Sequence, residues 1–130
     1  MKIKKLSLLN WMIFKGEQSI SFAEGDANIT IVYGENMHGK TSLLNAIRWC
    51  LYGTAINRQS SAIPEHDLIN INAHRRGENL TSVKLKLEID DKNYEVEREL
   101  DFSSGAPKQR KSLRIDGRAI DGCKINLEIE

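Results

Sequence analysis

Eight consecutive residues of the chain fit the pattern G-x-x-x-x-G-K-[ST], a loop that binds the phosphates of a nucleoside triphosphate together with magnesium. In order they are Gly34, Glu35, Asn36, Met37, His38, Gly39, Lys40 and Thr41. Backbone N–H groups of such a loop surround the phosphates, and the N-terminus of the following helix adds partial positive charge. Gly39 permits close backbone approach, Lys40 places an ammonium near the β and γ phosphates, and the Thr41 hydroxyl ligates Mg²⁺. We include the next residue, Ser42, in the predicted site.

Two loop positions leave alternatives open. Met37 occupies a place that the basic pattern leaves free, so either the loop forms there without a positive φ or some strain is tolerated. His38 could reach the nucleotide or a partner, although a solvent-facing histidine at a loop tip is the favoured interpretation.

The elements on both sides of the loop are those it requires. Residues 28–33 are β-branched and aromatic and predict a buried strand. A helix is expected over residues 40–52, because Leu43, Leu44, Ile47 and Leu51 recur on one helical face, with Gly53 at its stop. A strand, a glycine loop and a helix in this order favour a nucleotide site over a glycine-rich turn with an incidental lysine.

The remaining sequence predicts mostly strands. We expect strands at residues 3–9 and 19–22, a long polar segment at 54–79 in which only residues 68–69 are buried, and β-hairpins over 80–130 with turns at 90–93 and 116–117. The last predicted strand covers residues 125–129. One helix among seven or eight strands gives a strand-rich α/β fold of α+β-like type, in a single partial domain of residues 1–130 whose first part is 1–53.

Composition limits the classes of function. The 130 residues are 40% hydrophobic and 28% charged, as in a soluble globular protein, and 19 Lys plus Arg face 18 Asp plus Glu. Residues 1–16 carry four lysines and no acid, and residues 108–118 carry five bases and one acid. A nucleic-acid surface and solvated strands both explain this clustering. Cys50 and Cys123 lack metal-ligand spacing, so we expect reduced cysteines and a cytoplasmic protein without membrane spans.

The motifs together resemble the N-terminal half of the ATPase head in the SMC family and its relatives RecN, SbcC and DndD, a branch of the ABC ATPases. The matching segments are LSLLNWMIF at residues 6–14, SISF at 19–22, the phosphate loop, and SLLNAIRWCLYG at 42–53. The resemblance is close over residues 1–53 and general, as a run of hairpins, over 80–130. The helix sequence and Phe14-Lys15-Gly16 lean toward DndD-like ATPases of DNA modification and defence systems.

This resemblance implies a P-loop NTPase lobe of the ABC ATPase head type that binds Mg²⁺ and ATP. ATP binding would close two heads into a homodimer on DNA, and hydrolysis would reopen them. Family loops carry a glycine where Met37 stands, and many relatives have Arg or Lys at the position of Met12. Lys15, three residues later, is the substitute that we assign to the phosphates.

Hydrolysis in the family needs a glutamine loop, a buried strand ending in Asp-Glu, and a signature motif from the second head. Two segments imitate these motifs. Residues 85–91 end in Asp-Asp but alternate with lysines, and Pro107 after residues 103–106 forbids the helix that a signature motif opens. We therefore expect no catalytic residue in this chain, poor ATP hydrolysis by it alone, and the need for a C-terminal lobe. The chain would be a first lobe, either naturally short or a piece of a longer protein.

Two other functions compete with this interpretation. The chain could be a non-catalytic interaction module whose hairpins dock a nuclease or modification partner, with nucleotide as a structural ligand. A small P-loop kinase or GTPase is disfavoured, because the sequence lacks an N-K-x-D-like base-reading element and a lid-like arginine cluster.

Overall fold

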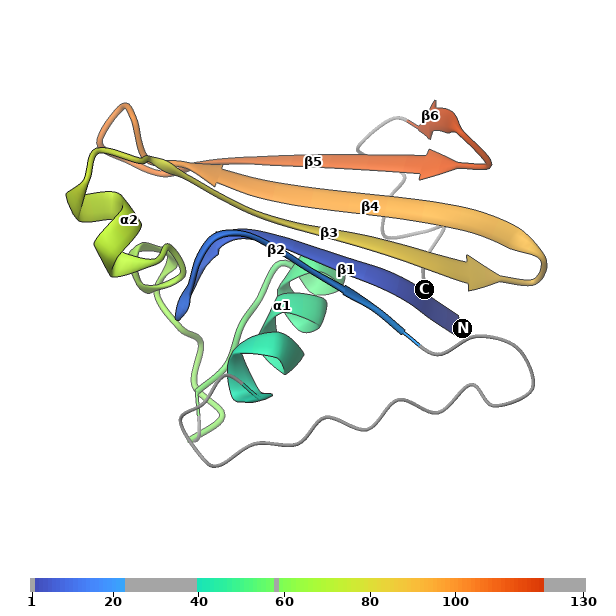
Figure 1. Cartoon of the computed structure of the whole chain (residues 1–130), viewed down its shortest axis with the longest axis horizontal. Coiled ribbons are helices and arrows are strands. Elements are labelled where there is room, and N and C mark those ends of the chain that lie inside the picture. The colour runs from blue at the N-terminus through green and yellow to red at the C-terminus, as the bar shows by residue number, and fades with distance from the viewer. Residues whose placement is uncertain (1, 23–39, 58, 121–130) are drawn as a thin grey trace.

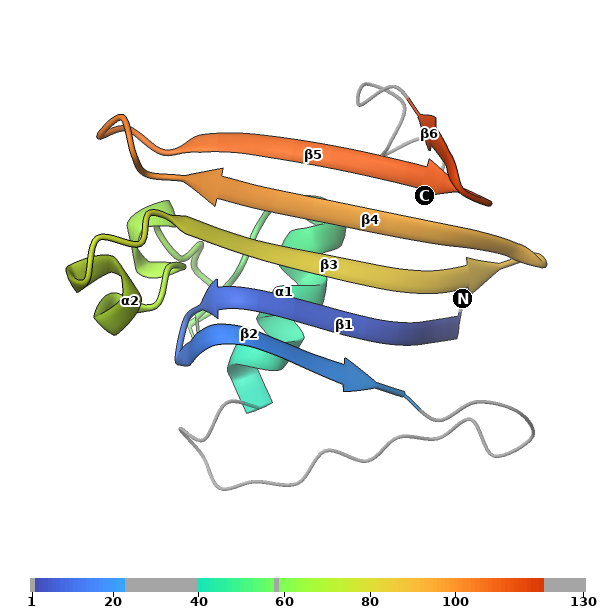
Figure 2. The same cartoon turned by 45° about the horizontal axis from the view of Figure 1, so that its top comes forward.

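A six-stranded antiparallel sheet with one principal helix on one of its faces forms the part of the chain that we describe. The computed structural model describes residues 2–22, 40–57 and 59–120. The sheet order is β2-β1-β3-β4-β5-β6 (Figure 2). The strands are β1 (Lys2–Trp11), β2 (Phe14–Ser21), β3 (Leu80–Ile89), β4 (Lys92–Asp101), β5 (Lys108–Ile115) and β6 (Arg118–Ile120). The predicted strand-rich α/β fold with few helices is confirmed.

Alternation along the strands creates the core. In β3 the side chains of Val83, Leu85 and Leu87 are buried and face the helix, while the lysines between them point to the other side of the sheet. Tyr94, Val96, Arg98 and Leu100 of β4, Leu113 of β5, and Leu6 and Leu8 of β1 continue this buried face. Burial of these side chains is the main force that holds the sheet and the helix together.

The helix α1 (Lys40–Tyr52) packs against β1, β3 and β4 on this buried face (Figure 1). It has the predicted bounds. Ala46, Trp49 and Cys50 are its most deeply buried residues, between 0% and 1% exposed. Gly53 ends the helix in the left-handed region at φ +79°, and its N–H donates to the carbonyl of Trp49 at 2.7 Å.

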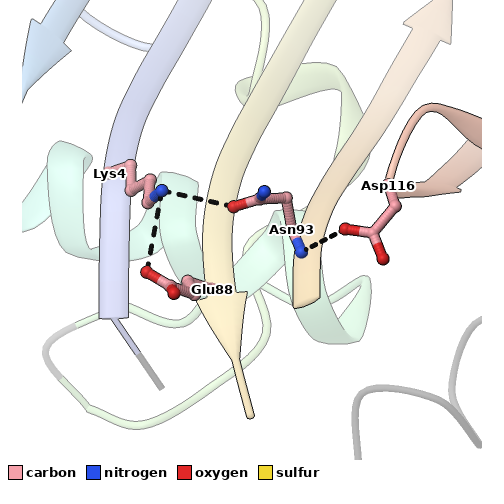
Figure 3. Close-up of polar contacts among 4 residues, drawn as sticks. All are labelled: Lys4, Glu88, Asn93 and Asp116. Carbon is pink, nitrogen blue, oxygen red and sulfur yellow. Dashed lines mark hydrogen bonds and ion pairs between the residues drawn. The ribbon is translucent and has the colours of Figure 1, made fainter. Parts of the chain in front are cut away.

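Charged side chains cover the opposite face of the sheet. The cross-strand register places Asp101 opposite Lys108, Glu99 opposite Arg110 and Glu95 opposite Arg114. Lys84 of β3 forms a 2.8 Å ion pair with Glu95. The bulged Lys4 of β1 reaches across two strands, donating to Asn93 Oδ1 at 3.2 Å and lying 3.6 Å from Glu88, and the Asn93 N–H donates to Asp116 Oδ1 at 2.9 Å (Figure 3). Positive and negative charges are thus interleaved over this face.

The β1–β2 hairpin differs from its sequence-based prediction. Strand β2 begins at Phe14, five residues before the predicted start at residue 19, and β1 continues to Trp11. The turn at residues 12–13 contains no glycine or proline. It is formed with positive φ values at Asn10 (+47°) and Met12 (+48°). The alternation of apolar and polar residues in this part of the sequence was therefore too short to predict where the hairpin turns. The predicted strands at residues 28–33 and 125–129 lie outside the described residues.

The polar segment after α1 is anchored at more places than predicted. It contains a 3-10 turn, η1 (Glu65–Asp67), and a short helix, α2 (Ile71–Arg75). Besides Leu68 and Ile69, the side chains of Ala55, Asn70 and Ala73 are buried. The expectation that residues 68–69 are the sole buried anchor was wrong, because small and polar residues also enter the interior here. Among the described residues, no helix is long and apolar enough to cross a membrane.

Replacing Gly53 by alanine tests the end of α1. A Cβ at this position would lie 3.0 Å from Nη1 of the buried Arg98, and L-residues adopt this φ at a cost. We expect Gly53→Ala to lower the free energy of unfolding by about 1–3 kcal/mol in urea denaturation. Gly105→Ala is the matched control, since Gly105 also has a positive φ (+91°) but no atom within 4 Å of its Cβ position. Equal losses in both variants would show that the Arg98 contact is immaterial.

Candidate functional site

The first turn of α1 carries the end of the predicted phosphate motif. Lys40 opens the helix, Thr41 is exposed, and Ser42 is buried at 6% exposure. The loop residues from Gly34 to Gly39 and the side chain of Lys40 lie outside what the structure describes. The described site is therefore the first turn of α1 and the elements that hold it.

Trp11 holds this turn from the sheet. Its indole Nε1 donates a hydrogen bond to the carbonyl of Ser42 at 2.9 Å, and the side chain is fully buried. The Trp11 ring stacks on Trp49 of α1 with 5.0 Å between centroids and an interplanar angle of 33°. Strand β1 therefore contacts α1 through both a directional bond and a large apolar surface.

Arg98 holds the other end of α1. This buried arginine of β4, 3% exposed, donates through Nε to the carbonyl of Cys50 at 3.2 Å. Its guanidinium carbon lies 5.9 Å from the Trp49 ring centroid. Burial lowers the pKa of Arg98, yet a guanidinium stays protonated at neutral pH. Because α1 has no basic residue in its own last turn, Arg98 supplies the positive charge that a helix C-terminus favours.

Two buried asparagines fix the β1–β2 turn. Asn10 accepts from the Gly16 N–H at 2.8 Å and donates to the Leu80 carbonyl at 3.2 Å. Asn70 donates through Nδ2 to the Met12 carbonyl at 2.9 Å, and its backbone N–H donates to the Asn10 carbonyl at 2.7 Å. Its Oδ1 also caps α2. These bonds orient the turn that carries Trp11.

Lys15, the other residue predicted to bind phosphate, lies on β2 just after this turn. Its side chain is exposed, and its carbonyl accepts a 3.3 Å bond from Gln18. The Trp11–Ser42 bond brings the end of β1 against the first turn of α1. Lys15 follows on the neighbouring strand, one residue after Phe14, which pairs with Trp11.

The charges of α1 suit an anion at its beginning. The first turn contains no acidic residue, so its partial positive charge is not neutralised from within the helix. Cys50, near the far end of α1, is a poor nucleophile, because burial raises the pKa of its thiol to about 12. Its Sγ donates to the carbonyls of Val83 and Val96 at 3.4 Å each, which agrees with the structural role predicted for it.

The two segments that imitate hydrolysis motifs have other roles in the fold. Asp90 and Asp91 are exposed and form the turn between β3 and β4 at φ +49° and +64°. Residues 103–106 are exposed and belong to the turn between β4 and β5, without a helix. Neither segment presents a carboxylate or a helix N-terminus to the first turn of α1.

Sequence reasoning missed four residues that position this turn: Asn10, Trp11, Asn70 and Arg98. Asn10 and Trp11 belong to the matched segment 6–14, whose pattern does not show which residues they contact. The sequence does indicate that Arg98 is buried, since it stands at a position of the alternating strand where an apolar residue is expected. Nothing in the sequence around Asn70 showed that its side chain would reach the β1–β2 turn.

Comparison with known proteins adds a family and two relatives. A family model described as AAA domain matches residues 5–129. The chain is 36% identical over 58 residues to the DNA replication and repair protein RecF of Chlorobium phaeobacteroides, covering 45% of this chain and 15% of that protein. It is 27% identical over 127 residues to the protein of the same name from Acetivibrio thermocellus, covering 98% of this chain and 30% of that protein. The chain thus spans less than a third of either relative.

Removal of the Asn10 side chain tests the β1–β2 turn. Asn10→Ala loses two hydrogen bonds and puts alanine at a positive φ, so we expect about 2–4 kcal/mol less free energy of unfolding. Urea denaturation followed by circular dichroism measures the loss. The control is Asn72→Ala on the exposed side of α2, which we expect to change stability by less than about 0.5 kcal/mol. A similar stability for the two variants would contradict the assigned role of Asn10.

Proposed function

Because the chain belongs to the AAA domain family, we propose that it is the ATP-binding lobe of an ATPase and binds the phosphates at the first turn of α1. The observation that carries the proposal is the placement of Lys40, Thr41 and Ser42. They form the first turn of a helix that has no acidic residue in that turn and whose position is set by a buried bond from the sheet. A triphosphate fits this environment because it is an anion.

Each residue of the proposed site has its own task. The backbone N–H groups of residues 34–39 surround the phosphates, and Lys40 contacts the β and γ phosphates. The exposed Thr41 hydroxyl ligates Mg²⁺, and Ser42 and Lys15 complete the site. Magnesium, when bound, neutralises phosphate charge and orients the triphosphate. The residues proposed here bind and orient, which is the ground-state part of phosphoryl transfer.

Hydrolysis requires a C-terminal lobe and a second head, which we propose as the principal partners. In support, α1 exposes large apolar side chains away from the sheet: Leu44 is 69% and Tyr52 61% exposed. Together with Arg48 between them they follow one line along the helix, at spacings of four residues. Two exposed large apolar side chains on the outer side of a core helix favour contact with another part of the same ATPase. The small share of each relative that this chain covers is consistent with such a part.

The proposed cellular role is association with DNA in repair, modification or defence. The two relatives are named for DNA replication and repair, which supports the repair role. The finer assignment to DndD-like ATPases, with a nuclease or modification partner, rests on the sequence of α1 and on residues 14–16. The interaction module remains the alternative function, and nucleotide-independent partner binding would favour it.

Replacement of Lys40 tests the nucleotide site. Lys40→Ala removes a charge-assisted contact to phosphate, so we expect Mg-ATP affinity to fall about 10- to 100-fold in calorimetry. The control is Arg48→Ala, which removes a base from the exposed face of the same helix and should leave affinity unchanged. ATP turnover by the unaltered chain should stay at background. Equal affinity of Lys40→Ala and the unaltered chain would refute the site.

The register of β4 and β5 predicts whether the basic residues of β5 contact DNA. Lys108 and Arg110 lie directly opposite Asp101 and Glu99, so acidic neighbours already balance their charge. The interpretation of this segment as solvated strand is therefore favoured over a DNA surface. We expect Lys108→Gln with Arg110→Gln to leave the salt dependence of DNA binding by the full ATPase unchanged. A slope reduced by about 0.9 per residue would show that these side chains contact phosphates.

A further inference from the structure

We propose that Trp11 is a positioning residue for the nucleotide site, and that its indole N–H sets the place of the first turn of α1 relative to the phosphates. This inference rests on the proposed function, because it assigns a role within the same ATP site. It concerns a hydrogen bond that the phosphate motif does not contain. The donor comes from strand β1, 31 residues earlier in the chain.

The bond is placed where it can act on the site. A carbonyl oxygen accepts two hydrogen bonds, so the Ser42 carbonyl can serve the helix and the indole together. The Nε1–O distance of 2.9 Å is that of a well-formed bond, and the contact is buried. Ser42 directly follows Lys40 and Thr41. A rotation or shift of the Ser42 peptide therefore moves the residues proposed to contact phosphate and magnesium.

Trp11 is itself held in place. The turn after it is fixed by the bonds of Asn10 and Asn70, and the residue pairs with Ile69 in a β-bridge. Its ring rests on Trp49, which in turn lies beside the Arg98 guanidinium. The indole therefore has little freedom to follow a displaced helix. A rigid donor against the first turn is what positioning requires.

A simple packing role for Trp11 makes a different prediction. Trp49 is as deeply buried, at 1% against 0% exposure, and it belongs to the same stacked pair. If bulk alone mattered, the loss of either indole would affect ATP binding equally. If the N–H matters, Trp11 is the sensitive position, since Trp11 and not Trp49 donates to the first turn.

The experiment compares Trp11→Phe with Trp49→Phe. Both exchange an indole for a smaller ring, and circular dichroism selects a temperature at which both are folded. Calorimetric titration with Mg-ATP should show affinity about three- to tenfold weaker for Trp11→Phe and changed by less than about twofold for Trp49→Phe. The gain in ATP affinity caused by Mg²⁺ should also shrink only in Trp11→Phe, because Thr41 is displaced.

A second substitution serves if Trp11→Phe does not fold. Benzothienylalanine at position 11 keeps the bicyclic shape and replaces the N–H by sulfur, so it removes the donor without a cavity. It should weaken Mg-ATP binding by the same about three- to tenfold. Unchanged affinity in this variant, or equal losses in the two phenylalanine variants, would overturn the role of Trp11 alone. Absence of Mg-ATP binding by the unaltered chain would overturn the proposed function and this inference together.

Discussion

The structure depends on the fixing of both ends of α1 by polar groups that rise from the sheet. Trp11 of β1 donates to the carbonyl of Ser42, and Arg98 of β4 donates to the carbonyl of Cys50. Apolar burial would permit a helix to slide or rotate, because that force has no direction. The two bonds remove this freedom. With these two hydrogen bonds, α1 has a defined axis and its first turn has a defined position on the sheet.

The buried guanidinium shows how this arrangement is stabilised. Moving an arginine out of water costs several kcal/mol. The Cys50 carbonyl, the partial negative charge at the end of α1 and the face of Trp49 together offset this cost. Gly53 makes room for the guanidinium, since any Cβ would lie 3.0 Å from Nη1. The absence of a side chain at Gly53 thus permits the charged Arg98 at a buried position of β4 where an apolar residue would be expected.

Local patterns were sufficient for much of this fold. The helical period and Gly53 predicted α1 from Lys40 to Tyr52, and alternation predicted β3 and the direction of its buried face. The predicted helical face was wrong at one position, because Leu44 is 69% exposed. The β1–β2 hairpin was harder, because Asn10 and Met12 make its turn through long-range bonds to Asn70 and Leu80. For the site, the motif named Lys40 and Thr41. It could not name Trp11 or Arg98, since their roles arise only when distant strands meet α1.

The stacked indoles have a practical consequence. The chain contains two tryptophans, and both lie in one pair with 5.0 Å between their rings, where the helix that opens with Lys40 meets β1. Its intrinsic tryptophan emission therefore comes from a single location, beside the Arg98 guanidinium. The protein carries its own optical probe at the helix where nucleotide is proposed to bind, and no label has to be attached.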